Sequence, residues 1–253
     1  MPLTRQDYAD IQGHIDLGIR LFGEYGLTMR ASDDMEDFAR FMAAQDNPIG
    51  LGSSHDPAFC HLTADNAFWI WLEDEHGERV ASASQKFVRT RSFIGEILSH
   101  RLFDSRAPVL DAPMPDLLDG AADSDFDFAG NVVYGSGLFV HPRYRGRGFI
   151  LLGRISRSLA LRHFDADYLV GIQAFRPGSD VRALKAQRYA NFKPALDGIP
   201  HRWGRQFQIA WSSRAEWLQA IRAELRDVEM HRAPPSPVPL DRTRAAAAGG
   251  SSA

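Results

Sequence analysis

The stretch from Gly137 to His163 places a strand, a glycine-rich turn and a helix directly after one another, and it restricts the fold more than any other feature of the chain. The strand-like run GLFV ends before Pro142, which has no N–H group to donate to a neighbouring strand. In the turn, Gly146 and Gly148 can adopt positive φ values, so successive backbone N–H groups can point into one concavity at the start of the helix. Such a concavity suits the two phosphate groups of a pyrophosphate.

The same turn carries Arg143, Arg145 and Arg147, whose positive charges favour an anionic ligand. Arginines that alternate along a turn cannot all face one ligand. Two common phosphate motifs do not fit, because a P-loop needs a lysine that the turn lacks and a dinucleotide-binding fingerprint needs a third glycine where Leu151 stands. The alternative is a surface loop in which the arginines only increase solubility.

Composition limits the class of protein. With 253 residues, of which 44% are hydrophobic and 24% charged, the sequence is an ordinary globular one. The formal net charge of −3 argues against a general nucleic-acid or membrane-surface binder. Cys60 is the single cysteine, which excludes an intramolecular disulfide and a thiolate zinc cluster, and no metal site is expected. Neither a signal-peptide pattern nor an apolar run of bilayer length occurs, so we expect a cytoplasmic protein.

Hydrophobic periodicity predicts alternating strands and helices, and therefore the α/β class. An N-terminal extension helix is expected within residues 1–25, and Ser32 is expected to cap a second helix. The run FWIWLEDEHGERVASASQKFV predicts a β-hairpin over 68–88, with Trp69 and Trp71 in the core. Later strands are expected near 131–140, 168–172 and 205–211, and later helices end near 163 and begin near 180 and 213.

Two segments have unusual composition. Residues 107–129 form an acidic insertion with six aspartates and no lysine or arginine, which predicts a loop. Two interpretations of this loop stay open, namely a solvated segment and a lid that attracts a cationic substrate. After a C-terminal helix over 213–232, in which Ser213 and Glu216 have capping-box spacing, residues 233–253 predict a disordered tail.

Arg143, Gly146 and Gly148 spell R-x-x-G-x-G after the run LFVHP, and in this the sequence resembles the GNAT superfamily of N-acetyltransferases. The likeness is strong over 131–211, faint over 27–88, and absent from the acidic insertion and the tail. It implies an α/β fold with a GNAT-like mixed, mostly antiparallel central sheet. This sheet would be flanked by helices and splayed between its two central strands.

The resemblance also implies that residues 26–212 form the N-acetyltransferase domain and that its turn holds the pyrophosphate of the co-substrate acetyl-CoA. In the strand NVVYGSGLFV, Gly135 and Gly137 predict a bulge that leaves main-chain N–H groups free for the acyl and pantetheine parts. Strand glycines that are merely flexible are the alternative. The expected cofactor-binding residues are Leu138, Phe139, Val140, Arg143, Arg145, Gly146, Arg147, Gly148 and Phe149.

The acid that protonates the leaving group is not marked by the family's usual residue. When Phe192 is aligned with the closing phenylalanine of the family, Gln187 takes the position of the catalytic tyrosine, and an amide cannot act as a proton-donating acid. Asn191 then replaces a glycine in the left-handed conformation at a helix C-terminus. Tyr189 is a candidate acid if the helix ends early, since two residues turn a helix by about 200°.

Tyr134 and Ser136, just before the expected bulge, are candidate catalytic residues for the base, and Glu96 is a carboxylate on a possible strand. Counting cannot assign their faces, because one extra residue in a bulge reverses the alternation of a strand. Ordered water is the alternative base. Nothing in the sequence points to Cys60 as a nucleophile.

These observations predict an acyl-CoA-dependent N-acyltransferase that transfers acetyl from acetyl-CoA to a primary amine by direct attack. The alternative is a non-catalytic acyl-CoA-binding or regulatory module of the same fold, which the amide of Gln187 favours. The expected partner is a small-molecule or peptide amine, cationic if the acidic insertion acts as a lid. A homodimer is left open, and no nucleic-acid or membrane partner is expected.

Overall fold

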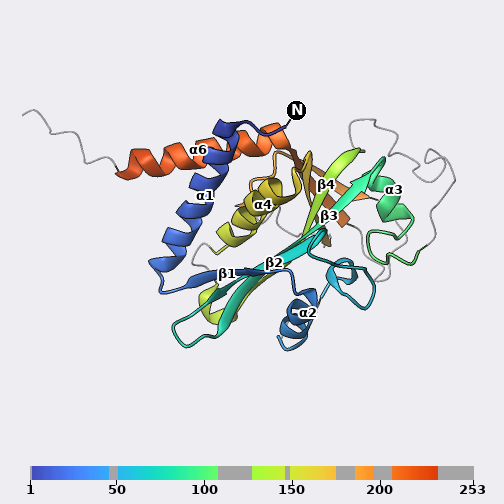
Figure 1. Cartoon of the computed structure of the whole chain (residues 1–253), viewed down its shortest axis with the longest axis horizontal. Coiled ribbons are helices and arrows are strands. Elements are labelled where there is room, and N and C mark those ends of the chain that lie inside the picture. Colours follow the sequence, from blue (N-terminus) through green and yellow to red (C-terminus); the bar gives the residue numbers. More distant parts are fainter. Residues whose placement is uncertain are drawn as a thin grey trace, which may run out of the picture.

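The computed structural model contains a seven-stranded sheet with the strand order β1-β2-β3-β4-β5-β7-β6 (Figure 1). Every neighbouring pair is antiparallel except β4 and β5, which run parallel. This is the expected mixed, mostly antiparallel sheet. The strands are β1 (Thr28–Ser32), β2 (Ala67–Glu73), β3 (Arg79–Thr90), β4 (Gly130–Val140), β5 (Tyr168–Ala174), β6 (Asn191–Leu196) and β7 (Phe207–Ser213). The structure describes residues 2–45, 51–107, 127–145, 149–174, 186–196 and 207–232.

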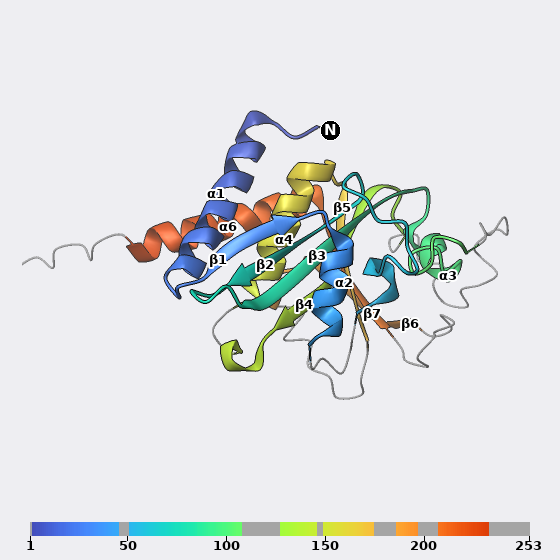
Figure 2. The same ribbon diagram turned by 60° about the horizontal axis from the view of Figure 1, so that its bottom comes forward.

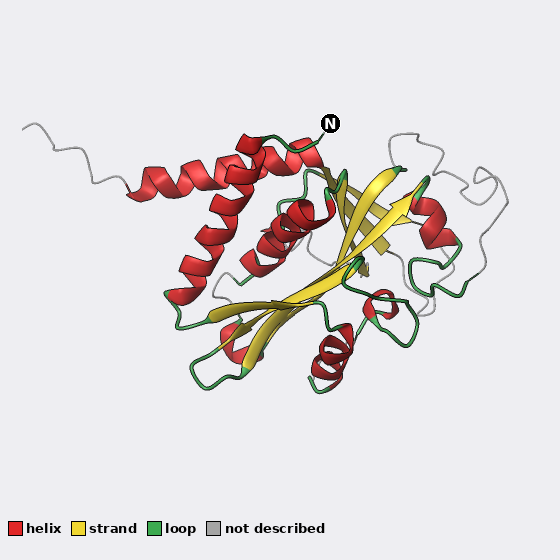
Figure 3. Cartoon of the chain, in the orientation of Figure 1, coloured by secondary structure: helices red, strands yellow, loops and turns green. Residues whose placement is uncertain are grey.

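Helices cover both faces of the sheet (Figures 1 and 3). One face carries α1 (Arg5–Gly23), α4 (Leu151–Phe164) and α6 (Arg214–Arg232), whose apolar residues share one core with Ile70, Leu72 and Val133 of the strands. The other face carries α2 (Met35–Ala43), which lies over β2 and β3, and α3 (Phe93–Leu98) (Figure 2). We call the face covered by α1, α4 and α6 the α4 face, and the face covered by α2 and α3 the α2 face.

Close packing holds α1 against α4. A Cβ atom at Gly18 would lie 2.5 Å from Cγ1 of Ile155, so only glycine lets the two helices approach this closely. At its start, α1 has a capping box in which the Thr4 side chain accepts from the Asp7 N–H and Asp7 accepts from the Thr4 N–H. The N-terminal helix is therefore part of the main core.

Several local predictions hold. Trp69 and Trp71 of the β2–β3 hairpin are buried, and Trp69 packs against Phe38 and Phe41 of α2. Before α6, the Ser213 N–H donates to Glu216 over 2.7 Å, and the Glu216 N–H donates back to the Ser213 hydroxyl over 3.3 Å. The expected capping box is therefore present.

Three local predictions are wrong. The cap of α2 is Asp34, which accepts from the Asp37 N–H, while Ser32 accepts from the Asp34 N–H in the turn before it. Glu96 lies in helix α3, which Ser92 caps, and not on a strand. Asn191 does not end a helix, because it begins β6. In this segment the described residue with a left-handed backbone is Arg188, at φ 56°.

Gly146, Arg147, Gly148, most of the acidic insertion (108–126) and the tail (233–253) lie outside the described residues. Within the described part, no helix is long and apolar enough to span a bilayer. The same part has no group of three or more His, Cys, Asp or Glu side chains that could hold a metal ion.

Candidate functional site

The two central strands separate halfway along their length. Backbone pairing between β4 and β5 runs from Val132 and Tyr168 to Gly135 and Gly171. Beyond this point β4 continues along β3 to Val140, while β5 continues along β7 to Ala174. The expected splay is therefore present, and its narrow end lies at the pair Gly135 and Gly171.

A bulge in β4 lies next to this gap. Ser84 pairs with Ser136 and Ser82 pairs with Phe139, so Gly137 and Leu138 together oppose one residue of β3. Gly137 has φ +60°, and a Cβ atom there would overlap the ring of Phe38 and lie 3.0 Å from the Ser84 hydroxyl. Only glycine meets both conditions without strain. Because of the bulge, the side chains of Ser136 and Phe139 lie on the same face of the sheet, although regular alternation would place residues three apart on opposite faces. Counting along the sequence could therefore not assign these faces.

Two buried serines of β3 hold the bulge in place. The Ser84 hydroxyl donates to the carbonyl of Ser136, and the Ser82 hydroxyl donates to the carbonyl of Gly137, each over 3.1 Å. In a trans peptide unit the C=O and the N–H point in opposite directions. The N–H groups of Gly137 and Leu138 therefore point away from these serines.

The described part of the arginine-rich turn shows two different environments. Arg143 donates to Asp74 over 3.0 Å and also to Glu78, at the turn between β2 and β3. Its guanidinium therefore faces the carboxylates of this turn. Arg145 is exposed, and its Nε donates to the carbonyl of Val140 over 3.2 Å.

The expected cofactor residues differ in which atoms they can offer. Phe149 is buried against Phe22, and Phe139 is buried against Phe41, so only their backbone groups are available to a ligand. Val140 packs partly against the core of the α4 face. Leu138, in the bulge, is 41% exposed and can offer its side chain.

Tyr189 lies at the narrow end of the gap. Ala186 is the last described residue in helical conformation before it, and the left-handed Arg188 turns the chain, so helical counting does not apply to this tyrosine. Its hydroxyl lies 2.6 Å from the place that a Cβ atom of Gly171 would occupy. Arg157 lies over the Tyr189 ring, 4.1 Å from its centre. The tyrosine is thus held on the α4 face where β4 and β5 separate.

Gln187 lies beside Tyr189 in the chain but has other contacts. Its side chain packs on Gly153 of α4, and its backbone carbonyl accepts from Arg157. Within the part of the chain that the structure describes, the side-chain oxygen is buried and has no hydrogen-bond partner. Gln187 therefore offers an acceptor and no acid, as the sequence indicates.

A second polar group lies at the gap on the α2 face. The phenol of Tyr134 lies within hydrogen-bonding reach of the Ser54 and Ser136 hydroxyls. Burial raises the pKa of Tyr134 to about 12, although the two hydroxyls act in the opposite direction. A phenol with this pKa stays protonated near neutral pH, so Tyr134 can donate a hydrogen bond but is unsuited to be the base.

His55 completes this group, and its sequence context does not mark it as a functional residue. Its Nδ1 lies 3.0 Å from the Ser54 hydroxyl, and its ring centre lies 5.3 Å from that of Tyr134. Burial and then the charge of Lys86 lower the pKa of His55 to about 3, against the effect of the Tyr134 carbonyl. The imidazole is therefore neutral. Its only signal in the sequence is one histidine in the run GSSHDP, with no motif around it.

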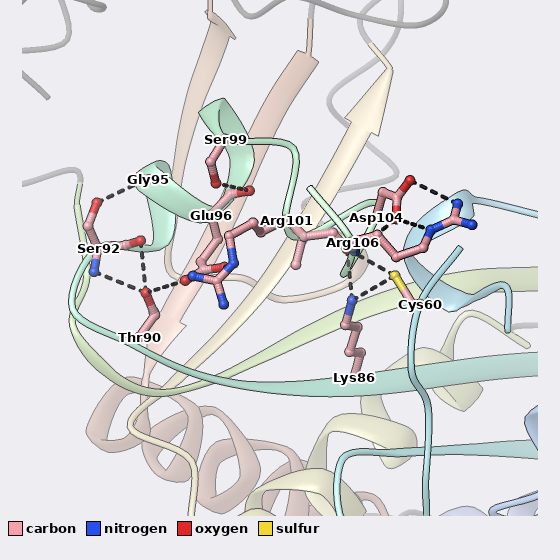
Figure 4. A network of polar contacts seen from close by, with 11 residues as sticks. Cys60, Lys86, Thr90, Ser92, Gly95, Glu96, Ser99, Arg101, Asp104 and Arg106 are labelled. Carbon is pink, nitrogen blue, oxygen red and sulfur yellow. Dashed lines mark hydrogen bonds and ion pairs between the residues drawn. The ribbon is translucent and has the colours of Figure 1, made fainter. Parts of the chain in front are cut away.

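Lys86 is itself fixed within the core. It pairs with Tyr134 across β3 and β4, and its Nζ donates to the sulfur of Cys60 over 3.1 Å and to the carbonyl of Leu102 over 2.8 Å (Figure 4). These contacts hold a positive charge close to His55. Cys60 is buried and serves here as the acceptor for this lysine.

One parallel strand pair, the splay and the bulge beside it define a GNAT-type fold. No protein-family model and no curated protein matches the sequence. Among solved structures, the chain is similar to a mutant of the spermidine N-acetyltransferase SpeG from Vibrio cholerae, with 13% identity and a TM-score of 0.45 over 77% of this chain and 97% of that one. It is also similar to NAA60 of Arabidopsis thaliana in complex with acetyl-CoA, with 15% identity and a TM-score of 0.42 over 75% and 99% of the two chains.

Proposed function

We propose that the protein is an acyl-CoA-dependent N-acyltransferase that transfers acetyl from acetyl-CoA to a primary amine. The observation that carries this proposal is the gap between β4 and β5, which starts at Gly135 and Gly171 and has the Gly137 bulge beside it. An extended acyl-pantetheine chain can replace the missing backbone partner of each strand there. Its pyrophosphate would then meet the turn before α4, where Arg145 is exposed.

Acyl transfer needs a polarised thioester carbonyl. The N–H groups of Gly137 and Leu138 supply donors that two serines orient before any ligand arrives. Donors fixed in this way stabilise the negative charge that develops on the carbonyl oxygen in the transition state. The amine nitrogen attacks the carbonyl carbon, and the bond between carbon and sulfur then breaks.

The departing thiolate needs a proton. Tyr189 is the described residue best placed to give it, because its hydroxyl lies at Gly171, where the gap begins. We assign it the role of general acid. The amine loses its own proton to solvent water, and the enzyme forms no covalent intermediate.

The acceptor is an amine of a small molecule or of a peptide. A cationic acceptor remains part of the proposal through the aspartates of 107–129, although residues 108–126 lie outside the described structure. The location in the cytoplasm also remains a proposal.

Thermal unfolding with acetyl-CoA, followed by turnover assays on a panel of amines, tests this function. A ligand of the native state at a hundred times its Kd adds about 2.7 kcal/mol of stability, so acetyl-CoA should raise Tm by several degrees. Gly146→Val should abolish the rise, whereas Gly23→Val, which has open space around it, should preserve it. Binding without turnover of any amine would favour the non-catalytic module. No response to millimolar acetyl-CoA would overturn the proposal.

A further inference from the structure

The polar group on the α2 face runs from the interior to the gap. Ser54 and His55 are fully buried, and Tyr134 is 5% exposed. Ser136 is partly exposed, and it is the first residue of β4 beyond the last pair with β5. Its hydroxyl therefore ends this row of polar groups at the gap, on the face opposite Tyr189.

We propose that Ser136 binds the nitrogen of the acceptor amine and that His55, acting through Ser54 and Tyr134, is the positioning residue that orients the Ser136 hydroxyl. This inference rests on the proposed function. It assigns the acceptor amine to the α2 face and the acid Tyr189 to the α4 face, so that the thioester lies between them.

We assign the direction of the hydrogen bonds starting from the neutral ring of His55 and proceeding through Ser54 and Tyr134 to Ser136. We assign the hydrogen of the neutral imidazole to Nε2, so that Nδ1 accepts from the Ser54 hydroxyl, which lies 3.0 Å away. The Ser54 oxygen then accepts from the protonated phenol of Tyr134, and the phenol oxygen accepts from the Ser136 hydroxyl. In this arrangement each of the three hydroxyl groups donates once, and the Ser136 oxygen keeps an acceptor position for a ligand.

An acceptor at this point has a defined chemical effect. An amine that donates one N–H to the Ser136 oxygen keeps its lone pair for attack only when it is unprotonated. Lys86 pairs with Tyr134 across β3 and β4, and its positive charge lowers the pKa of His55 in the same polar group. The same charge disfavours an ammonium ion there, because like charges repel. The subsite therefore selects the free base of the acceptor and directs its nitrogen toward the gap.

A spectroscopic experiment tests the arrangement without any turnover. In the full chain labelled with nitrogen-15, the two ring nitrogens of His55, identified by comparison with the His55→Asn variant, should show a neutral ring with its hydrogen on Nε2 at pH 7. Tyr134→Phe, which removes the donor to Ser54, should change the balance between the two ring tautomers. A protonated ring, or a ring with its hydrogen on Nδ1, would overturn the proposal even if the enzyme is active.

A kinetic experiment tests the role in acceptor binding. Ser136→Ala and His55→Leu should each raise the KM of the amine by about tenfold, the value of one hydrogen bond, with the KM of acetyl-CoA changed less than twofold. His55→Asn, whose side-chain oxygen can replace Nδ1 as an acceptor, should restore most of the loss. Because these residues act as one unit, the double variant Ser136→Ala with His55→Leu should be no worse than either single one.

Equal increases in both KM values, or additive losses in the double variant, would instead mean that His55 only supports the fold. If His55→Leu does not fold, Ser54→Ala breaks the same chain with a smaller change and takes its place. A wild-type protein that binds acetyl-CoA but acetylates no amine would refute the proposed function, and the tautomer of His55 would still decide the hydrogen-bond arrangement.

Discussion

At the scale of single residues, the buried His55 stays neutral at pH values where an ordinary histidine is protonated. The pKa of His55 is about 3 in the folded protein, lowered by burial and by Lys86, whereas the ordinary value is 6.5. Above pH 6.5 both the folded and the unfolded states are neutral at this residue. Between pH 6.5 and 3 the unfolded chain binds a proton that the folded chain does not, so the free energy of unfolding falls as the pH falls.

We therefore expect His55 to lower the free energy of unfolding by about 2 kcal/mol between pH 7 and pH 5, at about 1.4 kcal/mol per pH unit once the unfolded chain is protonated. Urea unfolding at both values, with wild type and His55→Asn, measures this loss. The variant should lack most of it. His76→Asn is the matched control, since His76 is exposed, and it should behave as wild type. An equal loss in all three proteins would contradict the buried neutral ring.

Tyr189 carries the second prediction at this scale. Tyr189→Phe removes only the hydroxyl at Gly171, and loss of a general acid should lower kcat by about a hundredfold or more. The thermal shift with acetyl-CoA should stay within a degree of wild type. Tyr8→Phe, at an exposed position on α1, is the control. Gln187→Ala should have only a modest effect, and a loss of more than about a hundredfold in that variant would mean that the amide has a role we have not assigned.

At the scale of elements, the bulge in β4 depends on one glycine. Gly137→Ala combines a positive φ with overlap against Phe38, whereas Gly77→Ala has a similar φ of +77° and open space around it. A non-glycine residue in the left-handed region costs about 1–2 kcal/mol, so both variants should lose about this much stability and Gly137→Ala should lose more. Only Gly137→Ala should also lose the thermal shift with acetyl-CoA. Equal unfolding free energies and equal shifts would show that the bulge is dispensable.

Elements also show how far local sequence determines structure here. The β2–β3 hairpin, the bulge and the strand before the arginine-rich turn follow from patterns that lie within a few residues of one another. β6 does not, because Asn191 and Phe192 form a strand only by pairing with Trp211 and Ala210 of β7. His55 could not be assigned for the same reason, since its partners Tyr134 and Lys86 belong to other elements.

At the scale of the whole molecule, the two ends of the described chain meet on the α4 face. Arg222 of α6 pairs with Asp7 and Asp10 of α1, and Arg154 of α4 pairs with Glu224 of α6. These contacts join the first and last helices to the helix that follows the arginine-rich turn. The family resemblance covers residues 27–88 and 131–211 and reaches neither α1 nor α6, so the packing of these two helices on α4 could not be predicted from it.

The short parallel contact has a mechanical consequence. In the described structure the sheet consists of two antiparallel leaves, β1 to β4 and β5 to β7, whose backbones join only from Val132 to Gly135 against Tyr168 to Gly171. This short parallel pairing joins the two halves of the sheet, and the gap separates them beyond it. A ligand that forms hydrogen bonds with both β4 and β5 across the gap would connect the two halves of the sheet at a second point. Part of its binding free energy would then stabilise the protein against separation of these halves.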